Sequence, residues 1–233
     1  MEVQAGPGKG LVLDVNPRWE HLFLEGDYEL KVQNLIERFC RLSVTFYDIG
    51  ANFGYYSLLA TRYGARAIAF EPDAANAENF LLHARLNGFG DRVWLEPTAV
   101  FSHTGQLLLR PAGRERPHGN AWVHTSDSSM TESVSVPCTT VDDYATSNPT
   151  PGVIKIDVEG AESEVLKGAR RTFQTVRPLL ICEVHDAVNE RFILPWLGER
   201  CYVTKWLEPT QAYPRQLFAW PSERGPTECD VER

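Results

Sequence analysis

The 233-residue sequence has no apolar run of the about 20 residues that a membrane-spanning helix requires. Its first residues, MEVQAGPGKG, also lack the basic-then-apolar order of a secretory signal. Cysteine is scarce: there are five, an odd number, and no two form a C-x-x-C pair. Zinc sites and a disulfide framework are therefore disfavoured. Together these absences predict a cytoplasmic protein with free thiols and no membrane partner.

Positive charge is also in deficit, with 23 Lys and Arg against 31 Asp and Glu and a net charge of -8. Such a balance lacks the electrostatic footprint of a general nucleic-acid binder. Apolar residues make up 43% and charged residues 23%, which is ordinary for a domain that buries a core without disulfides. We expect a globular protein that acts on a small molecule and not on nucleic acid. The composition leaves the oligomeric state open.

Strand-like apolar runs alternate with amphipathic segments from about residue 44 to residue 200. The predicted strands are 44–50, 65–73, 91–100, 152–160 and 177–185. The predicted helices are 28–41, 55–63, 74–88, 161–173 and 187–200, the last with a break at Pro195. Two further runs, 201–209 and 215–221, predict a C-terminal antiparallel hairpin. This order predicts an α/β fold with a doubly wound, mostly parallel sheet, whose ligand lies beyond the carboxyl ends of the strands.

The segments around this core predict four parts. Residues 1–43 form an N-terminal extension and a helix that packs on the core, with a β-ribbon expected over 1–26. Residues 44–221 form the ligand-binding domain. A Gly/Pro-bearing polar stretch at about 102–136 reads as an insertion or lid. Residues 222–233 read as a flexible tail.

The stretch DIGANFG follows the first core strand and resembles a nucleotide-binding loop without its middle glycine. Gly50 and Gly54 permit positive φ and close approach of a ligand to the backbone. Asn52 stands near the missing glycine, and asparagine tolerates the left-handed region better than most residues. The asparagine would hinder a pyrophosphate, whereas a smaller carboxylate needs less room at the helix start. An ordinary strand-to-helix turn is the alternative.

A second signal follows at Glu71, which stands 23 residues after Asp48 at the end of the second strand. An acid at this distance is where a ribose diol is bound, because a carboxylate accepts from both hydroxyls. Asp73, two residues on, is better explained as the N-cap of the next helix. A nucleoside that carries a carboxylate fits both signals, and S-adenosylmethionine is such a molecule.

Four motifs in order now carry a specific resemblance: FYDIGANFGYYSLLA, AFEPDAANAENFLLHARLNG, VIKIDVEGAESEVLKGA and LLICEVH, with TTVDDY between the second and third. The sequence resembles the FkbM-type S-adenosylmethionine-dependent methyltransferases from about residue 28 to residue 186. The resemblance implies a class I methyltransferase fold with a seven-stranded sheet and a terminal hairpin. It also implies methyl transfer to oxygen, often on a sugar or polyketide hydroxyl.

The resemblance implies the residues that hold the cofactor. The methionine part would be held by Asp48, Gly50, Asn52, Gly54 and Tyr55. The ribose would be held by Glu71 with Pro72, and the adenine would be flanked by Glu96 and Ala99. Asp157 would lie beside the sulfonium and the acceptor.

Charged residues also mark the ends of the fourth and fifth strands. Alternation directs Lys155, Asp157 and Glu159 to one side of the fourth strand, and Glu183 and His185 to one side of the fifth. These five are the candidate catalytic residues. A neutral histidine suits removal of the acceptor's proton, with Asp157 as the other candidate base. An ion pair of Lys155 with Asp157, and a helix-starting turn at Glu159, are the structural alternatives.

The acceptor is less well marked. Glu159, Glu183 and Asn120 are the candidate substrate-binding residues, the last within the 110–133 loop. No recognised metal signature is present, so we predict no metal. The sequence thus predicts an O-methyltransferase acting on a sugar, glycan or glycosylated metabolite. Methylation of a carboxylate or nitrogen of a small molecule or peptide, or a non-catalytic S-adenosylmethionine-binding module, are the alternatives.

Overall fold

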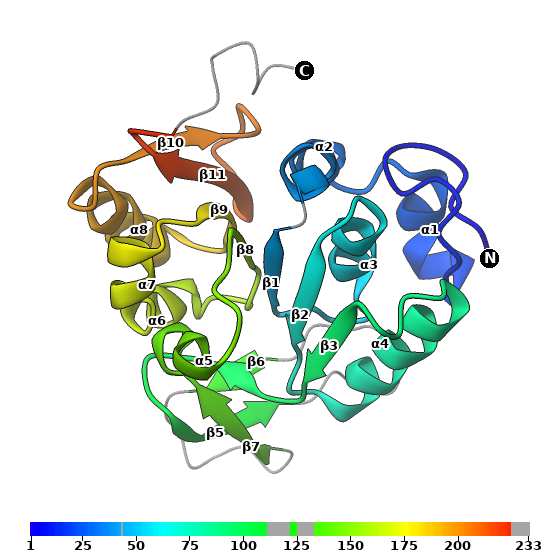
Figure 1. The fold of residues 1–233 in the computed structure, drawn as a ribbon, viewed down its shortest axis with the longest axis horizontal. Helices are drawn as coiled ribbons and strands as arrows, with labels where there is room; N and C mark the ends of the chain where they lie inside the picture. Colours follow the sequence, from blue (N-terminus) through cyan, green and yellow to red (C-terminus); the bar gives the residue numbers. More distant parts are fainter. Residues whose placement is uncertain (43, 111–121, 125–132, 225–233) are drawn as a thin grey trace.

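A seven-stranded sheet forms the centre of the molecule, in the order β10-β11-β9-β8-β1-β2-β3 (Figure 1). The computed structural model describes residues 1–233 except 43, 111–121, 125–132 and 225–233. The strands of this sheet are β1 Thr45–Ile49, β2 Arg66–Phe70, β3 Val93–Glu96, β8 Val153–Ile156, β9 Leu179–Val184, β10 Tyr202–Trp206 and β11 Arg215–Pro221. All neighbours are parallel except β11, which is antiparallel to both β9 and β10. The predicted doubly wound sheet with a terminal hairpin is confirmed.

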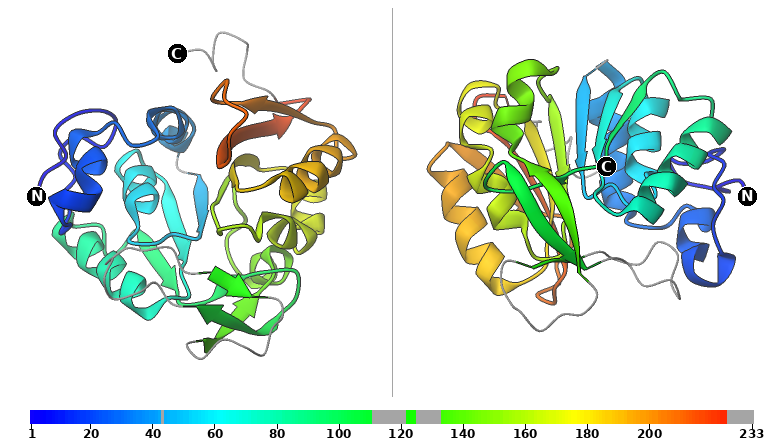
Figure 2. Two further views of the ribbon diagram at one scale, coloured as in Figure 1. Left: turned by 180° about the vertical axis from the view of Figure 1, so that it is seen from behind. Right: turned by 90° about the horizontal axis from the view of Figure 1, so that it is seen from below.

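Helices cover both faces of the sheet (Figure 2). One layer contains α1 Pro17–Glu25, α2 Leu30–Phe39, the 3-10 turn Cys40–Leu42, α3 Tyr55–Arg62 and α4 Ala74–Leu86. The other contains α5 Val141–Ser147, α6 Glu162–Lys167, α7 Arg170–Thr175 and α8 Ala187–Gly198. Along β1, Phe46 packs into the first layer and Tyr47 into the second, so the strand is apolar on both sides. This arrangement explains why β1 reads as a continuous apolar run.

A second sheet, in the order β4-β7-β5-β6, occupies the segment predicted as an insertion. Its strands are β4 Ala99–Val100, β5 Gly105–Arg110, β6 Trp122–His124 and β7 Val134–Thr139. The predicted strand 91–100 is therefore two strands in two sheets. Pro97 separates them, since proline has no N–H to continue the ladder of β3. The second sheet brings Leu109 and Val100 against the ends of β1 and β2.

Three further local predictions are wrong. Residues 17–25 form α1 and not a β-ribbon, because Asn16 accepts from the Arg18 N–H at 3.0 Å and Pro17 opens the helix. The predicted helix 161–173 is two helices, separated where a Cβ at Gly168 would overlap the backbone oxygen of Phe101. Helix α8 continues through Pro195 to its end. The hydrogen bond that Pro195 cannot donate falls in the last turn, where Arg200 caps the carbonyl of Trp196 at 2.7 Å.

None of the described helices is long and apolar enough to cross a membrane. Most of the predicted tail lies outside the described residues, and the predicted boundaries between the four parts stay a prediction.

Candidate active site

The loop between β1 and α3 has the conformation that its glycines and asparagine predict. Gly50, Asn52 and Gly54 all have positive φ, at 77°, 52° and 91°. A Cβ at Gly50 would overlap the backbone oxygen of Asp157, so only glycine lets the loop lie this close to β8. Asn52 accepts the Phe53 N–H through its own Oδ1 at 2.8 Å, which stabilises the left-handed turn locally.

Asp48 supports this loop from behind. Its side chain is fully buried, accepts from the Ser57 hydroxyl at 2.7 Å, and has Lys155 Nζ 3.5 Å from Oδ1. It is not among the residues that line either cavity described below, and neither is Gly54. Tyr55 lines the larger cavity, and its hydroxyl donates to Gln33 at 3.0 Å. These residues shape the loop, whereas Gly50 and Asn52 face the cavities.

Glu71 lies across from the loop at the end of β2. Its carboxylate accepts from the backbone N–H of Asn52 at 2.8 Å and of Asp73 at 2.9 Å. Burial, to 4% exposure, raises the pKa of Glu71 to about 7, although the two amides oppose the rise. Asp73 caps α4 by accepting from Ala75 and Asn76, as predicted.

A narrow cleft opens beyond these strand ends. Pro72, Ala99, Phe70 and Leu109 line it together with Glu71. Asn76 also lines it and is buried, and its Oδ1 has no hydrogen-bond partner among the described residues. Glu96 does not line the cleft, because its carboxylate accepts from the Tyr144 hydroxyl at 2.7 Å. The sequence reasoning missed Asn76 and Leu109, whose positions depend on the helix and on the second sheet.

A larger cavity of about 320 Å³ lies on the other side of the loop. Its charged lining is Lys155, Asp157, Glu159, Glu183 and His185. The predicted meeting of the polar strand ends is therefore confirmed. Gly50, Asn52, Asp157 and Glu159 line both this cavity and the narrow cleft, so the two spaces adjoin.

Lys155 forms the buried ion pair that the sequence left as an alternative. Its Nζ lies 3.3 Å from Asp157 Oδ2 and donates to the Gly50 carbonyl at 3.3 Å. Burial alone would lower the pKa of Lys155, but the carboxylates of Asp157 and then Asp48 outweigh it and raise the pKa. The same ammonium holds the pKa of Asp157 below its usual value against the effect of burial. Both groups are therefore charged at neutral pH.

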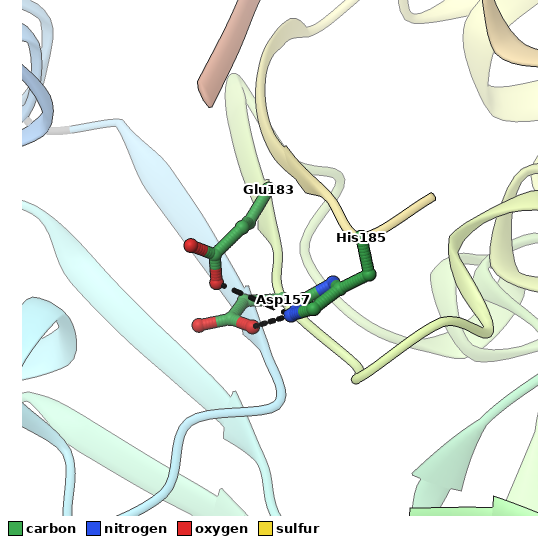
Figure 3. A group of neighbouring side chains, drawn as sticks. All are labelled: Asp157, Glu183 and His185. Atoms are coloured by element: carbon green, nitrogen blue, oxygen red, sulfur yellow. Dashed lines mark ion pairs between the residues drawn. The ribbon is translucent and has the colours of Figure 1, made fainter. Parts of the chain in front are cut away.

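His185 follows the end of β9, and its side chain points toward the carboxyl groups of Asp157 and Glu183 (Figure 3). Its Nε2 lies 3.4 Å from Glu159, 3.5 Å from Glu183 and 3.8 Å from Asp157. Burial disfavours the imidazolium, but the hydrogen bond that Nδ1 donates to Glu162 and then the carboxylates of Asp157 and Glu159 raise the pKa of His185.

Glu162 is a site residue that the sequence reasoning missed. It is fully buried, and its Oε1 lies 2.8 Å from Nδ1 of His185 and accepts from the Gly160 N–H at 2.8 Å. The Nδ1–H of His185 donates to this carboxylate oxygen, which fixes the ring and leaves Nε2 toward the cavity. The place of Glu162 in the first turn of α6, after KIDVEG, suits any acid at a helix start and so gives no separate sequence signal for a site.

Two other carboxyl groups of the larger cavity have raised pKa values. Burial, followed by repulsion from Asp157, raises the pKa of Glu159 to about 7. Burial and the charges of Asp157 and Glu29 raise the pKa of Glu183 to about 10. Glu159 also has a φ of 53° beside Gly160 at 97°, so it does form the helix-starting turn while it faces both cavities.

The sequence profile of the Methyltransferase FkbM domain matches residues 48–204, which is more than half of the chain. The chain belongs to the FkbM methyltransferase family. The predicted family and enzyme class, an S-adenosylmethionine-dependent methyltransferase, are thereby confirmed.

Relatives within and beyond the FkbM family agree with this assignment. The hexuronic acid methyltransferase AglP of Haloferax volcanii is 28% identical over 207 residues, covering 85% of this chain and 79% of AglP. An FkbM methyltransferase from Methylobacillus flagellatus KT superposes with a TM-score of 0.55 at 19% identity, over 86% of this chain. Our chain spans 52% of that protein's length. An O-methyltransferase from Bacillus cereus, in complex with S-adenosylhomocysteine, superposes with a TM-score of 0.53 at 11% identity. The match covers 89% of this chain and 82% of the Bacillus cereus chain. Both structures support the class I methyltransferase fold.

The site of this FkbM protein fits the cofactor that the family requires. The glycine-bearing loop leaves backbone space that any Cβ at Gly50 would fill, and Glu71 offers a buried carboxylate. The unpartnered Oδ1 of Asn76 adds an acceptor in the narrow cleft. The roles of the individual residues in binding stay predictions.

Two predictions concern groups at the edge of this site. Asp157, Glu183 and His185 offer ligand atoms within 4.8 Å of one another, a spacing at which oxygen and imidazole donors could hold a divalent ion (Figure 3). That the enzyme needs no metal stays a prediction. Asn120 lies outside the described residues, as does most of the 110–133 loop.

Proposed function

We propose that this FkbM protein is an O-methyltransferase that acts on a hydroxyl of a sugar, glycan or glycosylated small metabolite. The observation that carries the proposal is His185, whose Nδ1 is fixed by Glu162 at 2.8 Å and whose Nε2 is directed toward the cavity. A hydroxyl acceptor must lose a proton during methyl transfer, and an oriented imidazole suits that task. The relative AglP, a hexuronic acid methyltransferase, supports a carbohydrate acceptor.

The narrow cleft and the larger cavity have different roles in this proposal. The narrow cleft at Glu71 and Asn76 suits the nucleoside, and the loop at Gly50 and Asn52 suits the methionine end. S-adenosylmethionine supplies an activated methyl group when it is bound. Asp157, ionised and lining both spaces, favours a positive charge at their junction. The chain's own contribution to the reaction is alignment and proton removal.

His185 is the better candidate base of the two that the sequence predicts. The pKa of Asp157 is held low by Lys155, so its carboxylate takes up a proton poorly at neutral pH. Glu183, protonated at neutral pH, can donate a hydrogen bond and orient an acceptor oxygen. Glu159 lies 3.4 Å from Nε2 and stabilises the imidazolium formed.

Methylation of a carboxylate is the second candidate, because AglP is described as acting on a hexuronic acid. A carboxylate acceptor has no proton to lose at neutral pH and needs no base. Activity that survives both His185→Ala and Asp157→Ala would favour this alternative.

The test begins with calorimetric titration of the purified protein with S-adenosylmethionine and S-adenosylhomocysteine. We expect binding of both; an absence of both would end the proposal. The second step incubates protein and cofactor with a panel of sugars and glycosides and reads mass gain. Methylation on oxygen, lost in His185→Ala with cofactor affinity preserved, is the expected result.

A further inference from the structure

Two residues that line the larger cavity lie outside the span 48–204 that matches the FkbM profile. Tyr28 precedes that span and Pro214 follows it, yet both line the cavity beside Glu183 and His185. The two residues come from opposite ends of the chain. The residues that match the family profile therefore do not form this end of the cavity by themselves.

Tyr28 is held firmly in place. Its ring packs on Phe23 with centroids 3.8 Å apart and lies 6.5 Å from the ring of Tyr56. Burial and the carboxylates of Glu29, Asp157 and Glu183 raise the pKa of the Tyr28 hydroxyl, which indicates that the hydroxyl faces the same charged groups. The ring thus offers an apolar face and a polar tip to the cavity.

The residue that follows Tyr28 is strained. Glu29 has φ 44° and ψ 51°, a left-handed conformation that costs a residue with a Cβ about 1–3 kcal/mol unless its surroundings enforce it. Its carboxylate accepts from the Tyr56 hydroxyl and from Gln216 at 3.0 Å, and Gln216 also donates to Glu183 at 2.9 Å. The N-terminal and C-terminal flanks are therefore joined directly over a candidate catalytic residue.

The charges of the cavity indicate which acceptor it can take. Among the described residues that line it, only Lys155 and His185 are basic. Lys155 is already paired with Asp48 and Asp157, and His185 has four carboxylates within 3.8 Å. A carboxylate on the acceptor would find no uncommitted cation among these residues. Hydroxyl groups, by contrast, can donate to the carboxylates while a ring face packs on Tyr28.

We propose that Tyr28, Glu183 and Pro214 form the acceptor subsite, and that it takes an uncharged, hydroxyl-bearing sugar ring rather than a uronate. This inference rests on the proposed function, since it assigns the acceptor of that same reaction. The methionine end of the cofactor then occupies the part of the cavity nearest Gly50 and Asn52. In this proposal, the flanks of the family match contribute Tyr28 and Pro214 to acceptor choice, beside Glu183 from within the match.

The experiment compares matched acceptors and one side chain. Methyl glycosides of glucose, galactose and mannose are each paired with the corresponding hexuronate glycoside, and methyl transfer is measured by mass spectrometry. We expect at least one neutral glycoside to be methylated with a kcat/KM at least tenfold above that of its uronate. Preference for the uronates would overturn the inference.

The side-chain test uses Tyr28→Ala. The control is Trp94→Ala, which also removes an aromatic ring. Trp94 lies on β3, is 40% exposed and lines neither cavity. We expect Tyr28→Ala to raise the KM of the glycoside at least tenfold and to change the affinity for S-adenosylhomocysteine less than twofold. If Tyr28→Ala does not fold, Tyr28→Leu keeps apolar packing on Phe23. It should likewise raise the glycoside KM while leaving the affinity for S-adenosylhomocysteine nearly unchanged.

The remaining outcomes are also decisive. Weakened S-adenosylhomocysteine binding with an unchanged glycoside KM would assign Tyr28 to the cofactor and overturn the subsite. Tight S-adenosylhomocysteine binding with no methylation of any glycoside would overturn the acceptor class but leave a methyltransferase. Loss of S-adenosylhomocysteine binding in the unmodified protein would instead remove the proposed function itself.

Discussion

The two halves of the site, the narrow cleft at Glu71 and the larger cavity at His185, are formed by different kinds of chemical groups. The cleft at Glu71 uses backbone conformation, apolar side chains and one carboxylate whose partners are backbone amides. The cavity at His185 uses charged side chains from β8, β9 and α6 and from the turn between β8 and α6, and the pKa values of several are shifted. A nucleoside is the same in every turnover of every family member, whereas acceptors differ. In the proposed function, the half assigned to the constant ligand depends on the local turn at Gly50 and Asn52, whereas the half assigned to proton transfer joins side chains from distant parts of the chain.

The largest expected effect lies in the charged half. Replacing His185 with Ala should lower kcat about a hundredfold or more, because a positioned base contributes about 10²–10⁴-fold. S-adenosylhomocysteine affinity, measured by calorimetry, should change little. His21→Ala, an exposed histidine on α1, is the matched control. Equal loss of affinity and kcat would show that the two halves are not separable.

The pH dependence of the same reaction has a definite sign. The base must be neutral, and the pKa of His185 is raised above 6.5, so kcat should rise with pH along a limb above 6.5. The raised pKa also stabilises the fold at low pH, a contribution that is complete below the unfolded value and is lost as pH rises through the folded value. A kcat that falls with pH over this range would contradict the assignment.

The next effect lies in the other half. Glu71→Ala should weaken S-adenosylmethionine binding on the order of a hundredfold, since hydrogen bonds to a charged group contribute about 1.5–3 kcal/mol each. Because the pKa of Glu71 is about 7, affinity in the unmodified protein should rise as pH passes through that value and the carboxyl ionises. Glu78→Gln, exposed on α4, should leave both properties intact. Unchanged affinity in Glu71→Ala would remove the ribose assignment.

A smaller effect is expected at Gly50, which lines both the narrow cleft and the larger cavity. Gly50→Ala introduces a Cβ against the Asp157 carbonyl at a φ of 77°, which should displace the loop. We expect a lower melting temperature and about tenfold weaker cofactor binding by calorimetry. Gly90→Ala has open space around its Cβ and should alter neither. An unaffected Gly50→Ala protein would mean that the loop tolerates movement.

The smallest effect tests the proton on Glu183. Its pKa is about 10, so Glu183→Gln replaces a protonated carboxyl with a neutral amide of similar shape. Activity should stay within about threefold of the unmodified enzyme, whereas Glu183→Ala, which removes the partner of Gln216, should lose more. A Gln variant as inactive as the Ala variant would show that an ionised Glu183 is required.

What could be predicted from the sequence follows the same division. The Asn52 turn and the Asp73 cap depend on neighbours in sequence, and both are confirmed. The mostly parallel sheet follows from the alternation of strands and helices, and it is confirmed as well. Alternation also located Lys155 and Asp157 on one side of β8. The contact of Glu162 with His185 depends on how α6 packs against β9, so no local pattern reveals it. Tyr28 lines the cavity next to Glu29, which accepts from Gln216 of β11, and this contact between distant parts of the chain has no local sequence pattern either.

The order of strands also constrains how the chain is made. β11 is the last strand in sequence, yet it lies between β9 and β10. During translation, the backbone edge of β9 that pairs with β11 stays open until residue 221 has left the ribosome. A nascent chain therefore cannot complete the larger cavity, which Pro214 also lines, until its final strand inserts. The part of the narrow cleft that β1, β2 and α4 form can be assembled long before that moment.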